Sequence, residues 1–362
     1  MNDPSNPINL REYEAAARAV LPPEIFDWCA GGAGDEITLR ENEAAWAQVR
    51  LQPRAFVDVS DCSLGTAILG REVSMPVMTA PCSLNRMVHP DGELAVARAA
   101  AGAGIIQVVS MGSTASLEDI AAAAQGPRWC QLYCLRDRGV TRALAQCAEA
   151  AGFAALCVTV DAPVDGIRER TVRNGFRAPP PGIRPANLPR VPDEASGAAR
   201  EALLHDRSAA WDVVEWLRGL TRLPVVAKGI LNADDARLAV AHGASGLVVS
   251  NHGGRQLDSA IASCDALPRI VDAVSDRSEV YVDGGIRRGA DVLKALALGA
   301  RAVLIGRPFL WGLAVDGETG VRRVLEILRT ELENCMALAG CARPSHAGRA
   351  LIAGVSTLRT WP

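Results

Sequence analysis

The sequence predicts a (β/α)8 barrel that is preceded by a helical N-terminal segment. Short apolar runs rich in β-branched residues recur along the chain, and amphipathic patterns such as GELAVARAAAGAG and NADDARLAVAHGA separate them. Continuous apolar strands that alternate with helices are typical of a parallel sheet covered on its outer face. Eight such runs suit a closed barrel, with strands expected at residues 76–80, 105–110, 128–134, 154–161, 223–229, 246–251, 279–284 and 302–307.

A doubly wound open sheet is the alternative architecture for the same alternation. That fold normally places a GxGxxG turn after its first strand, where this chain has APCSLN at 80–85. Several predicted helices open with Asp, Ser, Thr or Asn and close on glycine, as capped helices do. The barrel is therefore the favoured prediction.

Two segments fall outside the regular repeat of strand and helix. The stretch LREYEAAARAVLPPEIFDWCAGGAG, before the first strand, predicts helices that pack against the barrel rather than a separate domain. After the fourth strand, residues 177–200 are rich in Pro, Ala and Gly and show no apolar period. This run predicts a long loop at the barrel mouth, either a lid or a disordered connection. Residues 1–362 are accordingly expected to form one domain.

The composition excludes several classes of protein. The 362 residues carry a formal net charge of −3, so a broad basic surface for nucleic acid is not expected. The start MNDPSNPINL lacks the basic and apolar regions of a signal peptide, and glycines and polar residues interrupt the uncharged stretch 99–117. We therefore expect a cytoplasmic protein without a membrane span. The ten cysteines are scattered without CxxC spacing, which favours free thiols over disulfides or a metal site.

Polar side chains follow several of the predicted strands at their carboxyl ends. The run VVSNHGGRQLD at 248–258 ends a strand on a histidine and an arginine with only glycines between them. Taken alone, His252 would more often be structural and Lys228 would be a rim lysine. In a barrel, however, all the carboxyl ends meet at one mouth, where the active sites of this architecture lie. The sequence therefore predicts a catalytic site built from Ser83, Ser110, Gln131, Tyr133, Asp161, Lys228, His252, Arg255, Asp283, Arg287 and Arg307.

Two of these strand ends predict an anion site. DGGIRRG follows the seventh strand and IGRP follows the eighth, so glycines that expose backbone N–H groups lie beside arginines. This pair of loops is the usual phosphate site of such barrels. A phosphorylated substrate or cofactor is therefore expected, and composition leaves its identity open.

The motifs resemble those of the FMN-dependent α-hydroxy acid oxidases and dehydrogenases, which include glycolate oxidase, lactate oxidase and mandelate dehydrogenase. SNHGGRQLD is highly specific, and QLY at 131–133, TVDAP at 159–163, VVAKGI, VDGGIRRG and LIGRP follow the family's order and spacing. The similarity runs from about residue 9 to about residue 341. The resemblance implies a bound FMN and the oxidation of an (S)-2-hydroxy acid to the 2-oxo acid.

The resemblance also implies a role for each matching residue. His252 would take a proton from the substrate, and Asp161 would orient it and stabilise its charged form. Arg255 and Arg168 would bind the substrate carboxylate, and Tyr133 would hydrogen-bond the substrate hydroxyl. The cofactor site would comprise Lys228 beside flavin N1, Ser83, Ser110, Gln131 and Thr159 along the flavin ring, Gly285, Arg287, Gly306 and Arg307 at the phosphate, together with Ser250 and Asp283.

Three positions that bear on the substrate depart from the family pattern. Trp28 stands in FDWCAGGAG, where the family usually has a tyrosine that helps to bind the substrate carboxylate. Glycolate oxidase has a tryptophan where this chain has Gly112, which leaves more room over the flavin, and Asp165 replaces an apolar residue. These changes indicate either neutral drift or a substrate larger than glycolate that carries an aryl or basic group.

The resemblance leaves the electron acceptor open. No apolar insert lies between Asp161 and Leu223, unlike in membrane-anchored mandelate dehydrogenases, so a membrane quinone is not expected. We expect dioxygen, with hydrogen peroxide formed, and a homotetramer by resemblance. The alternatives are a dehydrogenase with another acceptor, a relative that oxidises an amino or peptide-derived substrate, a non-flavin barrel with a phosphorylated ligand, and a flavin-binding module without activity.

Overall fold

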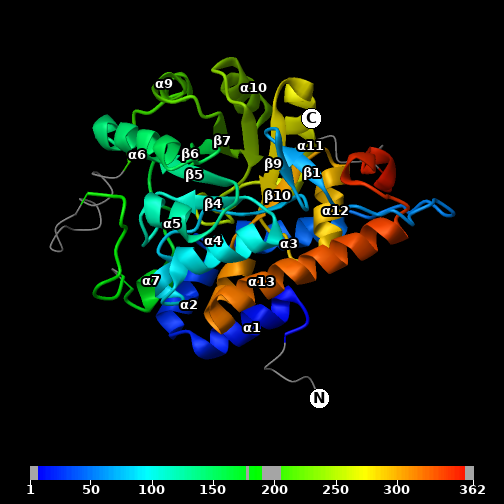
Figure 1. The fold of residues 1–362 in the computed structure, drawn as a ribbon, viewed down its shortest axis with the longest axis horizontal. Helices are drawn as coiled ribbons and strands as arrows, with labels where there is room; N and C mark the ends of the chain where they lie inside the picture. Colours follow the sequence, from blue (N-terminus) through cyan, green and yellow to red (C-terminus); the bar gives the residue numbers. More distant parts are fainter. Residues whose placement is uncertain (1–6, 177–178, 190–204, 355–362) are drawn as a thin grey trace.

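The computed structural model describes residues 7–176, 179–189 and 205–354. Within these ranges, eight parallel strands close into a barrel in the order β10-β3-β4-β5-β6-β7-β8-β9 (Figure 1). The predicted barrel is confirmed, and the open doubly wound sheet is wrong. Most predicted strands extend too far at the carboxyl end, where the chain already turns into the loops that carry the site. The strands are β3 (Val77–Thr79), β4 (Gln107–Ser110), β5 (Arg128–Tyr133), β6 (Ala155–Thr159), β7 (Val225–Ile230), β8 (Gly246–Val249), β9 (Glu279–Asp283) and β10 (Ala302–Ile305).

Helices cover the outside of the barrel, as the alternating pattern predicts. They are α4 (Gly92–Ala103), α5 (Leu117–Ala123), α6 (Arg138–Ala150), α9 (Asp212–Leu220), α10 (Ala233–Ala241), α11 (Ser263–Val274), α12 (Gly289–Ala297) and α13 (Arg307–Leu338), with short 3₁₀ helices at Asn85–Met87, Ser275–Arg277, Pro344–His346 and Arg349–Leu351. The side chains of Ser116 and Asn232 cap α5 and α10, and Gly104 ends α4 at φ 68°. α13 changes direction at Asp316 and Gly317, whose backbone angles are not helical.

A short hairpin closes the amino end of the barrel, whose interior is filled by apolar side chains. It consists of β1 (Thr66–Ile68) and β2 (Arg71–Val73), which pair antiparallel. Ile68 is fully buried in the interior cluster, and the N–H of Leu69 donates to the carboxylate of Glu279 at the start of β9. The hairpin was not predicted, because strands of three residues carry too little alternation to stand out.

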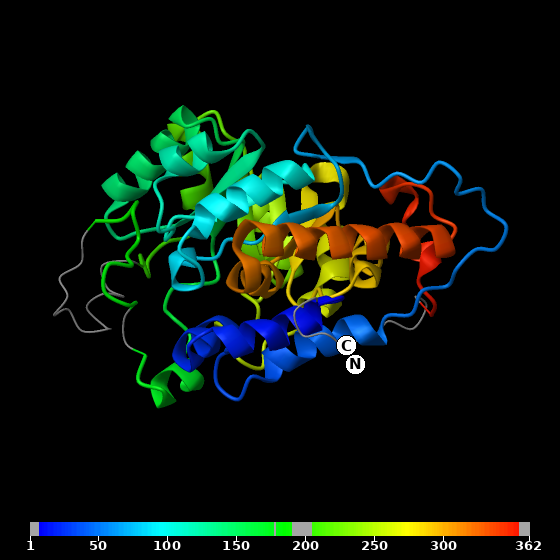
Figure 2. The same ribbon diagram turned by 60° about the horizontal axis from the view of Figure 1, so that its bottom comes forward.

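Helices also precede the barrel, as expected, and they are α1 (Leu10–Val20), α2 (Pro23–Ala30) and α3 (Ile37–Gln48). Figure 2 shows them in blue along one side of the molecule, next to α13. The stacked rings of Phe26 in α2 and Trp311 in α13 have centroids 5.0 Å apart. Trp46 of α3 donates its indole N–H to the carbonyl of Gly284, just after β9. The N-terminal helices therefore reach the carboxyl ends of the strands.

The long loop after β6 lies partly outside the described residues. Of the predicted structureless insert at 177–200, only residues 179–189 are described. This stretch has no helix or strand and rests on the loop after β4, where Asn187 donates to Ser113 Oγ at 2.8 Å. A short helix that was not predicted, α7 (Glu169–Arg173), precedes it.

Membrane-spanning helices, disulfides and metal clusters are all absent from the described residues. None of the helices in the described ranges is long and apolar enough to cross a bilayer. No disulfide joins the ten cysteines, all of which lie in the described ranges. The described residues also contain no group of three or more His, Cys, Asp or Glu that could hold a metal ion.

Candidate active site

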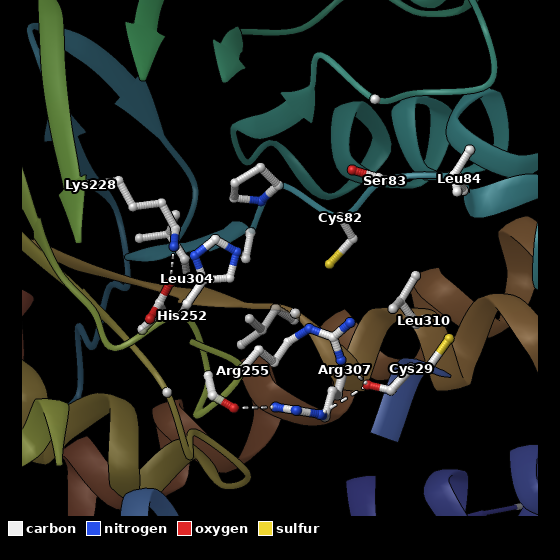
Figure 3. A pocket seen from close by; sticks show the side chains of 18 of the residues that line it. Cys29, Cys82, Ser83, Leu84, Lys228, His252, Arg255, Leu304, Arg307 and Leu310 are labelled. Carbon is white, nitrogen blue, oxygen red and sulfur yellow. Dashed lines mark hydrogen bonds and ion pairs between the residues drawn. The ribbon is translucent and has the colours of Figure 1, made fainter. Parts of the chain in front are cut away.

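A cavity of about 390 Å³ lies at the carboxyl ends of the barrel strands. Figure 3 shows Lys228 and His252 on one side of it and Arg307 beside Cys29 on another. Most of the predicted site residues line it, namely Trp28, Ser83, Gly112, Tyr133, Arg168, Lys228, His252, Arg255, Asp283, Gly285, Arg287, Gly306 and Arg307. The others lie behind this lining, in hydrogen-bond contact with it or with one another, and they are Ser110, Gln131, Thr159, Asp161 and Ser250.

His252 and Asp161 form an imidazole–carboxylate pair at the cavity. His252 Nδ1 lies 3.0 Å from Asp161 Oδ1. Burial opposes ionisation of Asp161, but His252 and Lys228 outweigh it and hold the pKa of this carboxyl below its usual value. An ionised Asp161 accepts a hydrogen bond, so it favours the tautomer with the proton on Nδ1 and leaves Nε2 able to accept a proton. Gly229, at φ 115°, permits this approach, because a Cβ there would lie 2.6 Å from the Cβ of Asp161.

The backbone around His252 is left-handed at three successive residues. The angle φ is 60° at His252, 66° at Gly253 and 72° at Gly254. Asn251 fixes this turn, because its carboxamide exchanges two 2.8 Å hydrogen bonds with Asn42 of α3 and its Oδ1 accepts from the N–H of Gly254. A residue other than glycine is uncommon in this region, so the surrounding contacts hold His252 in a strained conformation. The N-terminal helices thus help to position the imidazole.

Lys228 of β7 is a buried cation in the cavity wall. Its Nζ lies 3.1 Å from Asp283 Oδ2 and donates to Ser250 Oγ at 3.0 Å. Burial opposes the charge of the ammonium, but Asp283 and Asp161 outweigh burial and raise the pKa of Lys228. The side chain therefore stays positively charged. Asp283 Oδ1 is buried and has no hydrogen-bond partner among the described residues.

Arg255 and Arg307 hold the carboxyl end of α2 against the cavity. Arg255 Nη1 donates to the carbonyls of Trp28 at 2.8 Å and Gly31 at 2.9 Å, and Arg307 Nε donates to the carbonyl of Cys29 at 3.1 Å. Burial and neighbouring arginines lower the pKa of Arg255 to about 9 and that of Arg307 to about 10. Both guanidiniums remain charged at neutral pH, and the groups that they bind are carbonyl oxygens. Their positive charge is thus available to an anion in the cavity.

A chain of hydrogen bonds joins four of the predicted flavin-ring residues. The hydroxyls of Ser83 and Ser110 lie 2.9 Å apart, and Ser110 Oγ donates to Gln131 Oε1 at 3.1 Å. Gln131 Nε2 in turn donates to Thr159 Oγ1 at 3.0 Å. Because the Ser110 proton goes to Gln131, Ser83 is the donor to Ser110. Ser83 lines the cavity, and the other three fix its orientation from behind.

The loops after β9 and β10, where an anion site was predicted, both line the cavity. α13 begins directly after Gly306, and no side chain caps its amino end, so the positive end of its dipole adjoins the cavity. Pro308 has no N–H, and the N–H groups of Phe309 and Leu310 donate to the carbonyl of Gly306. Arg287 lies nearby with its Nη2 3.0 Å from Glu43 Oε1, and its buried Nε has no hydrogen-bond partner among the described residues. An uncapped helix end, an unsatisfied guanidinium donor and the charge of Arg307 together fit a phosphate group.

Tyr133 and Arg168 line the cavity together with Asp165 and His205, of which His205 was not predicted. The rings of Tyr133 and His205 meet edge-on with centroids 5.1 Å apart. Burial raises the pKa of Tyr133 to about 12, so its hydroxyl stays neutral and can donate a hydrogen bond. Arg168 Nη2 lies 3.7 Å from Asp165 Oδ1, and Arg168 Nε is buried without a hydrogen-bond partner among the described residues. This part of the cavity therefore offers a neutral donor and a guanidinium with one unsatisfied N–H.

Trp28 and Gly112, which were expected to depart from the family pattern, also line the cavity. Trp28 lies between Arg255, whose Cζ is 5.6 Å from the ring centroid, and Phe176, whose ring centroid is 6.3 Å away. A Cβ at Gly112 would come within 2.7 Å of Ser83 Oγ. The glycine therefore lets Ser83 approach this close, and any side chain here would collide with it.

Some residues that shape the site carry no local sequence signal for that role. Gln256 fastens the loop after Asp161, since its Nε2 donates to the carbonyl of Val164 at 2.8 Å and its Oε1 accepts from the N–H of Gly166 at 3.1 Å. Asn42 of α3 acts in the same way on the loop after β8. Asn42 and Gln256 contact residues that lie far away in the sequence, so spacing along the chain does not reveal these contacts. For Gln256, its position within the motif SNHGGRQLD could have indicated a role in the site.

The chain is similar over nearly its whole length to known enzymes. The sequence model of the family described as FMN-dependent dehydrogenase matches residues 17–354. The L-lactate oxidase of Nostoc sp. is 52% identical over 351 residues, which cover 94% of this chain and 96% of that protein. The 2-hydroxyacid oxidase 1 of Homo sapiens is 46% identical over 355 residues, with 95% of this chain and 96% of that protein covered. The glycolate oxidase of Spinacia oleracea is 45% identical over 352 residues, with 95% of each covered.

Solved structures of mandelate oxidase share the fold. One with benzoyl-formic acid has a TM-score of 0.88 at 48% identity, and it covers 95% of this chain and 98% of its own. Another, with (S)-2-phenylpropionate, has a TM-score of 0.88 at 47% identity and the same coverage. These similarities confirm the family that the motifs predict and exclude the non-flavin barrel. The chain belongs to the FMN-dependent dehydrogenase family and is an FMN-dependent oxidoreductase that acts on the CH–OH group of 2-hydroxy acids.

Proposed function

We propose that the protein oxidises an (S)-2-hydroxy acid to the 2-oxo acid and passes the electrons to dioxygen, with formation of hydrogen peroxide. The observation that carries this proposal is that His252 shares one cavity with two cations suited to a carboxylate, Arg168 and Arg255. A base and an anion site side by side match the two polar groups of a 2-hydroxy acid.

His252 acts as the base in the proposed reaction. Asp161, 3.0 Å from Nδ1, keeps the proton on that nitrogen and stabilises the imidazolium that forms when Nε2 takes a proton from the substrate. Tyr133, with its pKa raised to about 12, donates to the substrate hydroxyl as a neutral phenol. Arg168 and Arg255 bind the carboxylate. Because α2 engages Nη1 of Arg255, a two-point contact from this residue would use Nε and Nη2.

FMN, when bound, supplies the acceptor for the two electrons of the substrate, which no side chain provides. Lys228 would stabilise the negative charge that develops beside it, since Asp283 and Ser250 hold the ammonium in place. We propose that Arg287, Arg307, Gly285 and Gly306 hold the phosphate, that Ser83 contacts the ring, and that Ser110, Gln131 and Thr159 orient Ser83 from behind.

The proposed substrate is bulkier than glycolate. Trp28 gives the cavity an aromatic wall, and Gly112 adds no side chain to it. The structure of mandelate oxidase with benzoyl-formic acid, an aromatic 2-oxo acid, supports the same size class here. Discrimination in an apolar pocket is worth about 1–3 kcal/mol per group, so the preference should be graded rather than absolute.

Steady-state assays with glycolate, (S)-lactate and (S)-mandelate, combined with peroxide detection, test this proposal. We expect the kcat/KM for mandelate to exceed that for glycolate, with one peroxide formed per substrate oxidised. A kcat/KM that is higher for glycolate than for mandelate would contradict the proposal that the substrate is bulkier than glycolate. Reduced flavin that persists in air-saturated buffer would instead indicate a dehydrogenase with another acceptor. If none of the three hydroxy acids bleaches the flavin under anaerobic conditions, the alternative of an amino or peptide-derived substrate is favoured instead.

We also propose that residues 1–362 act as one domain, that the protein works in the cytoplasm and, by the family resemblance, that it assembles as a homotetramer. The free state of all ten cysteines suits a reducing compartment. Sedimentation velocity of the FMN-loaded protein tests the assembly, and a monomer at micromolar concentration would contradict it.

A further inference from the structure

One charged side chain of the cavity takes no part in the proposed reaction. Asp165 lines the cavity on the loop after β6, and its Oδ1 lies 3.7 Å from Arg168 Nη2. The Asp165 side chain is 64% exposed, so its carboxylate can reach a ligand. A carboxylate is unexpected beside a cation that binds the carboxylate of the substrate, because it competes for the same guanidinium and repels the same ligand.

The position of Asp165 is fixed from both sides. Gln256 accepts from the N–H of Gly166 at 3.1 Å and donates to the carbonyl of Val164 at 2.8 Å, so it holds the residues before and after Asp165. Gly166 has no room for a side chain, since a Cβ would lie 2.2 Å from the carbonyl oxygen of Arg255. The loop that carries Asp165 is therefore tied to the loop that carries Arg255, and the backbone holds Asp165 at the cavity beside Arg168.

The charges of the cavity show what Asp165 changes. Most of the other charged side chains are paired with one another, namely Lys228 with Asp283, His252 with Asp161 and Arg287 with Glu43. Arg255 and Arg307 bind carbonyl oxygens and keep their charge for anionic ligands. Arg168, in contrast, already faces Asp165. A substrate with a carboxylate alone loses attraction at Arg168, whereas a substrate that also carries a positive charge regains it at Asp165.

We propose that Asp165 selects a 2-hydroxy acid whose side chain carries a positive charge, such as an amine or a guanidine. This inference rests on the proposed function and narrows its substrate class. The substrate carboxylate lies on Arg168 and Arg255, its hydroxyl lies at His252, and its side-chain cation lies on the carboxylate of Asp165. Asp165 touches no reacting atom, so it determines specificity and takes no part in the chemistry.

The test compares two substrates of the same shape. These are the (S)-2-hydroxy acid analogue of lysine and its isostere, in which a methyl group replaces the terminal ammonium. Their kcat/KM values are measured for the FMN-loaded wild type and for Asp165→Asn. We expect the wild type to favour the cationic substrate and the variant to lower the ratio of the two values about tenfold, since a charge-assisted hydrogen bond is lost.

Matched controls separate the charge of Asp165 from other effects. Glu169→Gln removes an acid on the adjacent α7 that pairs with Arg173 at 2.7 Å and does not belong to the cavity lining, so the ratio should stay as in the wild type. Asp165→Glu keeps the charge and should keep most of the preference. Binding can also be measured without turnover, from the flavin absorbance, with analogues of the two substrates that lack the hydroxyl group. The ratio of their Kd values should rank the wild type and the variants in the same order as the ratio of kcat/KM.

Two results would overturn the inference and leave the proposed function intact. One is a wild type that prefers the neutral isostere. The other is an Asp165→Asn variant that changes both substrates equally, because Asp165 would then only position Arg168. If no 2-hydroxy acid reduces the flavin at all, lactate and mandelate included, the proposed function itself fails and this inference fails with it.

Discussion

The carboxamides of Asn42 and Asn251 face each other and exchange two hydrogen bonds of 2.8 Å. Asn42 lies on α3, ahead of the barrel, and Asn251 directly precedes His252 in the loop after β8. Asn42 Oδ1 also accepts from the N–H of Ser263 at the start of α11. The amide pair therefore joins the N-terminal helices to the loop that carries the proposed base.

Replacing Asn42 by Ala should remove both hydrogen bonds of the amide pair and leave the buried N–H of Ser263 without its acceptor, while the Asn251 carboxamide keeps its bonds with Gly254 and Ile261. A buried polar group left unsatisfied costs about 1–3 kcal/mol, so we expect the free energy of unfolding to fall by that amount. A double variant with both residues replaced by Ala should lose less than the sum of the two single losses, because the first replacement already breaks the pair. Urea denaturation measures these values, and additive losses would argue against the pair.

Arg307→Ala should weaken FMN binding. Arg307 adjoins the uncapped start of α13, and its charge is available to a phosphate. A hydrogen bond to a charged group is worth about 1.5–3 kcal/mol, which corresponds to a rise of about ten- to a hundredfold in the Kd for FMN. Arg322→Ala is the matched control on the same helix, because Arg322 pairs with Glu318 at the surface. Calorimetric titration of the two apoproteins with FMN measures these Kd values. Equal values for the two variants would show that Arg307 does not bind FMN.

Arg255→Lys should raise the KM for the substrate more than it lowers kcat. Nη1 of Arg255 binds the carbonyls of Trp28 and Gly31, and the rest of the guanidinium is free to bind the substrate. A lysine ammonium cannot reproduce both contacts, because it lacks the planar fork. We expect a KM about tenfold higher in steady-state assays, in line with the loss of one charge-assisted hydrogen bond. An unchanged KM would show that Arg255 serves only to hold α2.

Asp161 should stabilise the protein in a pH-dependent way. Although burial opposes its ionisation, His252 and Lys228 lower its folded-state pKa below the ordinary value of 3.8. The stability that a lowered pKa contributes is fully present above the unfolded-state pKa, and it is lost as the pH falls through the folded-state pKa. The difference in unfolding free energy between wild type and Asp161→Asn should thus shrink as the pH is lowered below about 5 toward the folded-state pKa of Asp161. A difference that grows toward low pH would contradict this sign.

Much of the fold could be predicted from the sequence, because each strand of the barrel is buried on both faces and reads as a continuous apolar run. The hairpin at 66–73 could not, since its two short strands are recognisable only by their burial under the barrel. The helix α7 has only five residues and none of them is buried, so no apolar period marks it.

In the candidate site, too, some contacts could be predicted from the sequence and others could not. His252 and Asp161 could be predicted to meet because barrel geometry brings strand ends together wherever they lie in the chain. The contacts of Asn42 and Gln256 depend instead on how loops and helices cross, which no spacing encodes. At Gly112 the sequence suggested open space, whereas the structure shows that Ser83 approaches so closely that a side chain would collide with it.

The proposed reaction depends on His252 as the base that takes a proton from the substrate in the FMN-bound protein. Anaerobic stopped-flow reduction of the flavin in wild type and His252→Ala tests this role most directly. We expect the variant to keep its full FMN content and to be reduced about 10²–10⁴-fold more slowly, which is the usual contribution of a general base. A reduction rate within about tenfold of the wild type, at equal FMN content, would contradict this role of His252.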